Sequence, residues 1–243
     1  EFVIEARLIP AQKVKVVYLG VPLDDFSRQR TSEEITQARA ALGIAAGEFA
    51  VGTVTRLHDS KGNDYLIDAA ARVVAERPSA RFFLVGEGPL LPDLQAQAAR
   101  LGLGDRFVFA GFQRDVAAVL SAFDLSVFPS LWEGTPITGF EALAMGKPIV
   151  STDADGLLDI LTPDRDALIV PKRDAVALAA KIVWAMDHPE VRAQLSTAAR
   201  EAGKRYDIDA FVRKMEQLYV LLHRVSSATR RQGILQADLS FLI

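Results

Sequence analysis

The chain has 243 residues, of which 50% are hydrophobic and 24% charged, so it can bury a large core and has the composition of a soluble globular protein. Its net charge of −3 argues against nucleic-acid binding, because proteins that bind nucleic acid carry an excess of basic residues. It contains no cysteine, which excludes disulfides and thiolate metal sites and is compatible with a reducing cytosol.

The chain begins at Glu1 rather than at a methionine, so we interpret it as part of a longer protein. No apolar run approaches the roughly 20 residues that span a bilayer, and no secretory signal is recognisable. We therefore expect a cytoplasmic location. Three segments are predicted: the remnant of a preceding helix or linker over 1–13, a domain over 14–225, and a tail over 226–243 that begins polar and ends apolar.

Short β-rich runs alternate with helical patterns along the chain. Most of these runs are continuously apolar, which is typical of strands covered on both faces. The alternation predicts an α/β fold with a Rossmann-like, doubly wound parallel sheet and helices on both faces. The predicted strands are 14–19, 49–55, 81–85, 106–109, 125–128, 148–151 and 167–170.

Helices are predicted between the strands and after the last one. In 65–74, apolar residues recur at steps of three and four, the period of an amphipathic helix, and Pro78 ends it. From Asp174 onward only helices are predicted. The last clear helix has one apolar face, which contains Phe211, Met215, Leu218, Tyr219 and Leu222.

Two carboxylates, Glu133 and Glu141, flank a stretch of glycine, proline and threonine where strand 125–128 gives way to a helix. Ligands of open α/β sheets bind at the carboxyl ends of strands, and the free N–H groups at a helix start suit phosphate. The pair could divide the work of a reacting centre and a hydroxyl acceptor, although glutamates at this spacing are usually surface charge. Trp132 beside them is expected to be a core anchor rather than a pocket wall.

Arg56 and Lys61 flank a polar loop that follows strand 49–55. A guanidinium pairs with phosphate through two parallel hydrogen bonds, and an ammonium adds a compact charge, so the two suit a diphosphate. The alternative, two solvated loop cations, has about equal support from this segment alone. His58 between them is more typical of a loop residue than of a catalyst.

Two further loops follow strands. Gly86 stands directly after strand 81–85, where a glycine lets the backbone approach a ligand, although Gly-x-Gly there is often only a tight turn. The spacing is not a dinucleotide fingerprint, because Leu91 occupies the third glycine position. Phe112 lies in a loop that could seat a flat base, while Asp115 in the same loop could equally be an ordinary helix cap.

Taken together, these segments resemble the C-terminal, donor-binding half of GT-B glycosyltransferases, in particular the retaining family 4 (group 1) type. The resemblance covers about 14–219, and the ordered series of motifs is much more specific than any one of them. The matching stretches are 17–26, 52–57, 61–62, 83–90, 108–112, 128–136 and 141–150.

The resemblance implies a role for each charged residue that matches. Arg56 and Lys61 would bind the donor's diphosphate and stabilise charge on the leaving nucleotide. Glu133 would face the donor sugar, so Glu133, Arg56 and Lys61 are the expected catalytic groups. Glu141 would accept hydrogen bonds from the ribose hydroxyls.

The uncharged substrate-binding residues follow in the same way. Backbone N–H groups of Ile137, Thr138 and Gly139 would meet the distal phosphate, Phe112 would seat the base, and Gly86 would lie in the glycine loop of the site. No metal and no cofactor are expected, because cations and a helix dipole replace the divalent ion in such enzymes.

Three positions depart from the family's pattern. Thr55 stands where a glycine is frequent, and Asp155 and Asp159 replace one glycine and the glutamate that follow strand 148–151.

The resemblance also implies partners: a UDP-, GDP- or ADP-sugar as donor substrate, and an N-terminal domain, missing here, that holds the acceptor of a hexosyl unit. The isolated half is expected to be inactive in transfer, and any membrane association would come from the missing half. Two alternatives stay open: a nucleotide-sugar epimerase or phosphorylase of the same fold, and a non-catalytic nucleotide-binding or interaction module.

Overall fold

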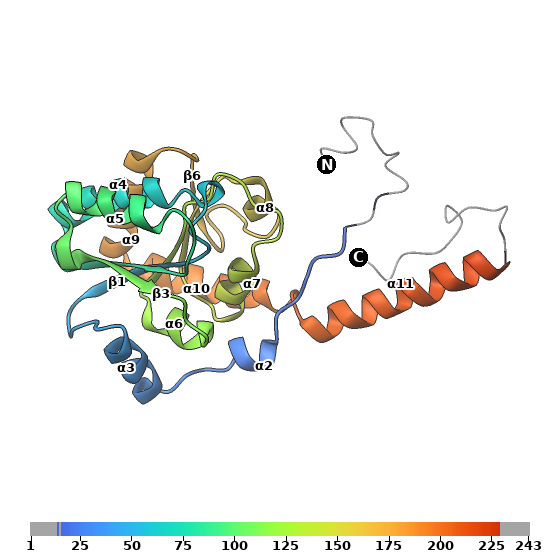
Figure 1. Cartoon of the computed structure of the whole chain (residues 1–243). Helices are drawn as coiled ribbons and strands as arrows, with labels where there is room; N and C mark the ends of the chain where they lie inside the picture. The colour runs from blue at the N-terminus through green and yellow to red at the C-terminus, as the bar shows by residue number, and fades with distance from the viewer. Residues whose placement is uncertain (1–13, 15, 229–243) are drawn as a thin grey trace. The chain divides into compact units, whose positions relative to one another are not determined.

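The computed structural model of the protein describes residues 14 and 16–228 (Figure 1). The predictions for 1–13 and for most of the tail 226–243 lie outside the described residues.

The chain divides into two compact units. The larger comprises Leu23–Arg205, and the smaller comprises residues 1–22 and 206–243. The predicted extent of the main domain, 14–225, stays a prediction. Every predicted site residue lies in the larger unit.

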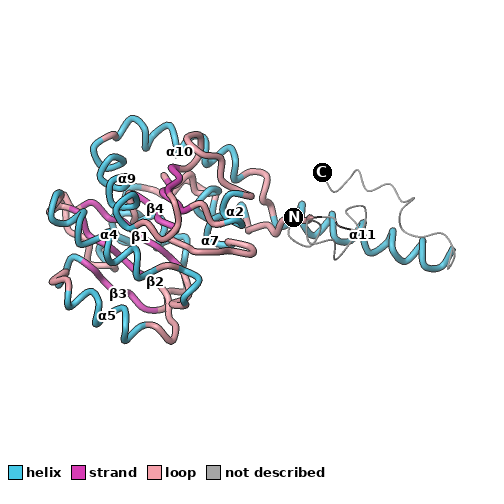
Figure 2. The backbone as a smooth tube through the Cα atoms, turned by 90° about the horizontal axis from the view of Figure 1, so that it is seen from above, coloured by secondary structure: helices cyan, strands magenta, loops and turns pink. Residues whose placement is uncertain are grey.

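A six-stranded parallel sheet forms the centre of the larger unit (Figure 2). Its strands are β1 (Phe49–Val54), β2 (Ala80–Val85), β3 (Phe107–Gly111), β4 (Leu125–Phe128), β5 (Ile149–Thr152) and β6 (Leu168–Val170). The strand order is β3-β2-β1-β4-β5-β6. From β1 the sheet extends through β2 to β3 on one side, and through β4 and β5 to β6 on the other. This confirms the predicted doubly wound parallel sheet and places its switch point between β1 and β4.

The strand predicted over 14–19 is wrong. The described residues of that run form no strand, and the nearest pairing is an isolated bridge between Val21 and Asp207. The Val21 N–H donates to the Tyr206 carbonyl at 2.8 Å, within the smaller unit. Valine and tyrosine suit a strand, but strand formation requires a neighbouring backbone to pair with, and a local pattern cannot supply one.

Helices cover both faces of the sheet, with α4, α5 and α9 on one face and α3 and α6 on the other (Figure 1). The helices of the larger unit are α2 (Leu23–Phe26), α3 (Ser32–Ala41), α4 (Asn63–Glu76), α5 (Leu91–Arg100), α6 (Val116–Ala122), α7 (Ile137–Ala144), α8 (Asp155–Leu158), α9 (Ala175–Asp187) and α10 (Pro189–Gly203), with short 3-10 turns η2 (Asp59–Lys61) and η3 (Gly104–Arg106). The helix predicted from 65–74 is α4, which ends before Pro78 as expected.

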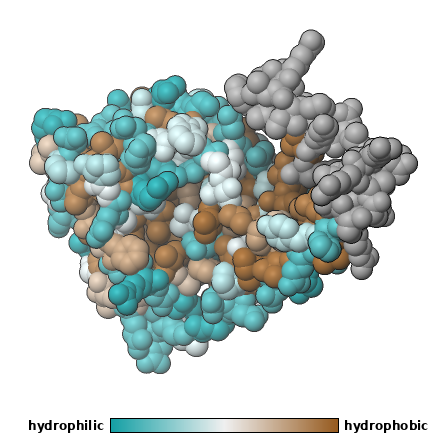
Figure 3. Space-filling view, turned by 45° about the vertical axis from the view of Figure 1, so that its right-hand side comes forward, coloured by the Kyte–Doolittle hydropathy of each residue, from teal (hydrophilic) through white to brown (hydrophobic). Residues whose placement is uncertain are grey.

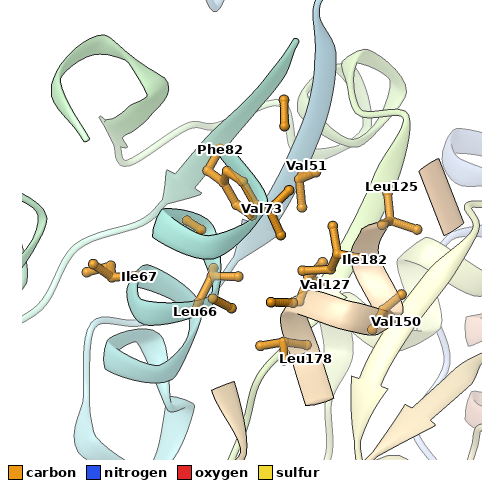
Figure 4. Close-up of a cluster of buried hydrophobic side chains, with 14 of the residues drawn as sticks. Val51, Leu66, Ile67, Val73, Phe82, Leu125, Val127, Val150, Leu178 and Ile182 are labelled. Carbon is orange, nitrogen blue, oxygen red and sulfur yellow. The ribbon is translucent and has the colours of Figure 1, made fainter. Parts of the chain in front are cut away.

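The face under α4 and α9 contains a continuous apolar core (Figure 4). Strand, α4 and α9 side chains meet there, and each fully buried one contributes roughly 1.5–3 kcal/mol. The labelled members are Val51, Leu66, Ile67, Val73, Phe82, Leu125, Val127, Val150, Leu178 and Ile182. This packing fixes the strands relative to one another, so the starting points of the loops at their carboxyl ends are fixed as well.

The smaller unit contains the long helix α11 (Ile208–Ala228), which confirms the last predicted helix. On its predicted apolar face Phe211, Met215, Leu218 and Leu222 are half-buried, whereas Tyr219 is 65% exposed. Among the described residues, no helix combines the length and hydropathy needed to cross a bilayer.

On the opposite face of the sheet, Phe123 packs directly on the backbone of β1. Its ring stacks with that of Phe83 at 6.0 Å between centroids. A Cβ atom added to Gly52 would lie 2.1 Å from the Phe123 ring. Glycine is therefore needed at position 52 because an aromatic ring occupies the place of its side chain.

We expect Gly52→Ala to lower the free energy of unfolding by about 1–3 kcal/mol, the usual cost of overpacking a core. Urea denaturation would measure this. Gly134→Ala is the matched control, since a Cβ atom there would meet nothing within 4 Å. Equal stability of the two variants would contradict the packing argument.

Candidate functional site

A cleft of about 650 Å³ opens at the carboxyl ends of β1, β2 and β4, next to the switch point of the sheet. Its walls include strand ends such as Thr53, Val85 and Phe128. Most of the predicted site residues line it: Arg56, Lys61, Gly86, Phe112, Glu133, Ile137 and Thr138. The predicted residues Gly139 and Glu141 are not part of its wall.

An ion pair between Lys61 and Glu133 lies in the wall of this cleft. The Lys61 Nζ is 2.7 Å from both carboxylate oxygens of Glu133, and the side chains are only 16% and 8% exposed. The Ser130 hydroxyl donates a further hydrogen bond to Glu133 Oε1 at 2.7 Å. Removing one partner of a buried pair typically costs about 3–5 kcal/mol, so this contact anchors both loops that carry it.

Backbone contacts between these two loops set the geometry of the pair. The Leu131 N–H donates to the Ser60 carbonyl at 2.8 Å. Gly62 has a φ of +59°, and a Cβ atom there would lie 2.1 Å from the Pro129 carbonyl oxygen. Glycine therefore allows the loop after β1 to lie directly against the loop after β4.

The loop after β5 supports Glu133 from another side. A Cβ atom at Gly156 would lie 2.5 Å from the Glu133 carbonyl oxygen, so α8 packs against the backbone of the site. The two family departures in this loop, Asp155 and Asp159, are exposed. The close contact to Glu133 depends on Gly156, whereas both aspartates face solvent.

Arg56 and Lys61 both line the cleft, and of these two cations Arg56 remains available to a ligand. Its side chain is exposed, and no hydrogen bond or ion pair joins it to any residue that the structure describes. Lys61 differs, because two of its three N–H donors are directed at Glu133. An anion in the cleft could therefore meet a free guanidinium and one remaining ammonium donor.

The glycine loop after β2 is held by backbone approach. Gly86 has a φ of +135°, and a Cβ atom there would lie 1.9 Å from the Thr55 carbonyl oxygen. Its N–H donates to the Gly111 carbonyl at 2.8 Å. Gly86 lines the cleft, but the neighbouring loops alone already require a glycine at this position.

The structure decides two of the alternatives that the sequence left open. Asp115 accepts a hydrogen bond from the Ala118 N–H at 2.8 Å, so it caps α6. His58 is exposed, and its Nδ1 accepts a long 3.5 Å bond from the Ser60 N–H at the start of η2, so it is a loop residue. Phe112 is 64% exposed and lies in the cleft wall, where it could stack with a flat ligand.

The start of α7 offers fewer backbone donors than predicted. The Ile137 N–H donates to the Thr135 carbonyl at 3.0 Å, and the Gly139 N–H to the Pro136 carbonyl at 2.8 Å. The Thr138 N–H has no partner within the described residues. The first turn of the helix uses the other two donors itself, which sequence spacing could not reveal.

Glu141 lines a second cavity of about 540 Å³, which shares Val116 with the main cleft. Arg28, Arg30 and Arg114 also lie in its wall. No described residue pairs with the Glu141 carboxylate, and burial raises its pKa from 4.5 to about 7. An unpaired, half-buried carboxyl beside the cleft is ready to accept hydrogen bonds from a polar ligand.

Trp132 is not the core anchor that we predicted, since it is 62% exposed and lies outside the cleft wall. It belongs to the loop between β4 and α7, where no element of the larger unit covers it. Ile137 is exposed in the same region, at 51%. The face shown in Figure 3 likewise has hydrophobic residues grouped between hydrophilic areas.

The chain is similar to known proteins in both sequence and structure. A sequence profile of the family described as glycosyl transferases group 1 matches residues 48–188. The chain is 29% identical over 221 residues to the lipopolysaccharide core biosynthesis mannosyltransferase LpsB of Rhizobium meliloti (strain 1021), covering 85% of this chain and 63% of that protein. It is 31% identical over 226 residues to the 2-deoxystreptamine N-acetyl-D-glucosaminyltransferase of Streptomyces fradiae, covering 91% and 53%.

Among solved structures, the chain is similar to Anabaena HepE in complex with UDP and glucose. The TM-score is 0.79 at 27% identity, and the match covers 85% of this chain and 56% of that one. The chain thus spans between 53% and 63% of the length of these three proteins.

We expect Glu141→Gln to stabilise the protein above pH 7 by about 1–3 kcal/mol. Because the folded pKa is raised, the unfolded chain ionises first, and the wild type loses stability as the pH rises from 4.5 to about 7. Urea denaturation between pH 4 and pH 8 would measure the difference. Glu76→Gln, at the exposed end of α4, is the control. A Glu141→Gln difference that does not change with pH would contradict the assignment.

Proposed function

Because this chain belongs to the group 1 glycosyltransferase family, we propose that it is the donor-binding half of a GT-B enzyme. That enzyme transfers a hexosyl unit from a nucleotide-diphosphate sugar to an acceptor, with retention of anomeric configuration. The observation that carries the proposal is the cleft in which the free Arg56, the Lys61–Glu133 pair and the start of α7 converge. The complexes of HepE with UDP and with UDP-glucose support a nucleotide sugar as the ligand class.

In this proposal the diphosphate lies between Arg56, the third N–H of Lys61 and the Thr138 N–H. Transfer breaks the bond between the sugar carbon C1 and the diphosphate oxygen, and the electron pair stays on that oxygen. An acceptor hydroxyl oxygen forms the new bond to C1 and gives its proton to the departing diphosphate oxygen. The two cations and the positive end of α7 stabilise this charge, and a preorganised site of this kind lowers the barrier by several kcal/mol. This is the role that a divalent ion has in metal-dependent transferases, so the proposed reaction is metal-independent.

The two glutamates have different roles in the proposal. Glu133, fixed in the cleft wall by Lys61 and Ser130, faces the donor sugar. Glu141 lies in the adjoining cavity and accepts hydrogen bonds from the ribose hydroxyls. The base would then lie near Phe112.

In our proposal, an N-terminal domain across the cleft binds the acceptor. This agrees with a chain that spans about half the length of its relatives. The exposed Trp132 and Ile137 at the loop between β4 and α7 would lie at that boundary. The half described here would bind the donor in the cytoplasm and would transfer poorly without its partner. Any membrane association would come from the other half.

Calorimetry with UDP, GDP and ADP and their hexose conjugates is the test of donor binding. We expect at least one pair to bind with a dissociation constant between micromolar and millimolar, and transfer only when an acceptor domain is supplied. Absence of binding by all of them at millimolar concentration would refute the proposal. The nucleotide that binds best identifies the base.

We expect Lys61→Ala and Arg56→Ala each to weaken diphosphate binding by roughly 1.5–3 kcal/mol, as for a charge-assisted hydrogen bond, and to leave binding of the parent nucleoside nearly unchanged. Titrations with UDP and uridine would show the difference. Arg72→Ala, on the exposed side of α4, is the control cation.

Lys61→Ala also leaves Glu133 without its counter-charge. The loss of diphosphate binding caused by Lys61→Ala should therefore be smaller when the substitution is combined with Glu133→Gln. Equal losses for UDP and uridine in both single variants would argue against a role at the phosphates.

A further inference from the structure

Ser130 stands at the centre of a chain of hydrogen bonds that ends on Glu133. The residue is 3% exposed, and its hydroxyl donates to Glu133 Oε1 at 2.7 Å. Its carbonyl oxygen accepts a hydrogen bond from the hydroxyl of Thr152, the last residue of β5. The end of β5 is thus connected through Ser130 to the carboxylate that Lys61 holds from the other side.

Other buried serines of the sheet region behave differently. Ser121 and Ser151 donate to backbone carbonyls within three residues, the usual solution for a buried hydroxyl. Ser126, four residues before Ser130 and on β4, has a buried hydroxyl without a partner among the described residues. The hydrogen bond from a buried serine to a carboxylate is therefore particular to Ser130, because the other three hydroxyls bond to a backbone carbonyl or to no described residue.

The hydrogen-bond capacity of Lys61 shows why Glu133 needs a second support. In the described structure two of its three donors are directed at the two Glu133 oxygens. A diphosphate that binds the third donor of Lys61 would draw the ammonium toward the cleft and weaken these two bonds. The hydroxyl of Ser130 keeps Oε1 bonded when this happens, and Oε2 becomes the oxygen that can turn to a ligand.

We propose that Ser130 is a positioning residue for Glu133: it holds the carboxylate in orientation toward the donor sugar while the diphosphate engages Lys61. This inference rests on the proposed function, since it assumes that Glu133 meets the sugar. Ser130 also lines the cleft, but the hydrogen bond that its hydroxyl donates goes to Glu133. Its loss should therefore affect recognition of the sugar and spare recognition of the nucleotide.

The test compares UDP-glucose with UDP by calorimetry on the chain described here. We expect Ser130→Ala to reduce the ratio of the two affinities by about 3–10-fold, with the affinity for UDP nearly unchanged. Ser126→Ala is the matched control, a buried serine on β4, the strand just before Ser130, whose hydroxyl bonds to nothing described, and it should leave the ratio unchanged. Ser130→Thr keeps the hydroxyl and should restore the ratio.

A double-mutant cycle separates positioning from general damage to the loop. In a Glu133→Ala background, Ser130→Ala should no longer change the ratio, because the group through which it acts is gone. An equal loss of UDP and UDP-glucose affinity in Ser130→Ala, or an undiminished effect in the Glu133→Ala background, would overturn the proposal.

A measurement without nucleotide makes the result independent of donor binding. The ¹³C resonance of the Glu133 carboxyl should shift in Ser130→Ala and stay in place in Ser126→Ala. If none of the UDP-, GDP- and ADP-hexoses binds the wild type while the resonance shifts as expected, the proposed function fails and the link between Ser130 and Glu133 stands. An unchanged resonance in Ser130→Ala refutes the link itself.

Discussion

The parallel pairing of β1 with β4 is the constraint on which the candidate site depends. These strands are neighbours in the sheet, with Val51 opposite Leu125 and Gly52 opposite Ser126, although two strands and three helices separate them in the chain. Parallel strands end at the same edge, so the loop that carries Lys61 and the loop that carries Glu133 must lie side by side. A core packed on both faces keeps those strand ends in place.

Close backbone approach converts this neighbourhood into a defined geometry. Gly62 lies against the Pro129 carbonyl, Gly86 against the Thr55 carbonyl, and Gly156 against that of Glu133. A Cβ atom at any of these positions would lie within 2.5 Å of a carbonyl oxygen, so the loops would have to move apart. The glycines of the site thus act on loop packing, and the cleft is a consequence of that packing.

The charges of the cleft are held in a state that a ligand can change. Lys61 is paired with Glu133, and Arg56 has no partner among the described residues; in the adjoining cavity, the Glu141 carboxyl has a pKa raised to about 7 by burial. A diphosphate would redirect Lys61, and hydroxyl groups near Glu141 would favour its ionised form. In the proposed function, binding of the donor would therefore lower the pKa of Glu141.

The sequence by itself determined the class of fold, the strands from β1 to β6 and the chemical types at the sheet edge. Continuous apolar runs and amphipathic periods are local signals, and residues such as Arg56, Lys61 and Glu133 stand directly after such runs. The resemblance to group 1 glycosyltransferases rests on the same local order of motifs.

Tertiary structure decided how these residues are used. The strand expected over 14–19 had no partner edge, Trp132 had no element to cover it, and the first turn of α7 used the N–H groups of Ile137 and Gly139. The Lys61–Glu133 pair joins residues 72 positions apart, and Ser130 supports Glu133 from three positions earlier in the same loop. Such contacts follow from which strands pair and which backbones meet, and no local pattern of residues contains that information.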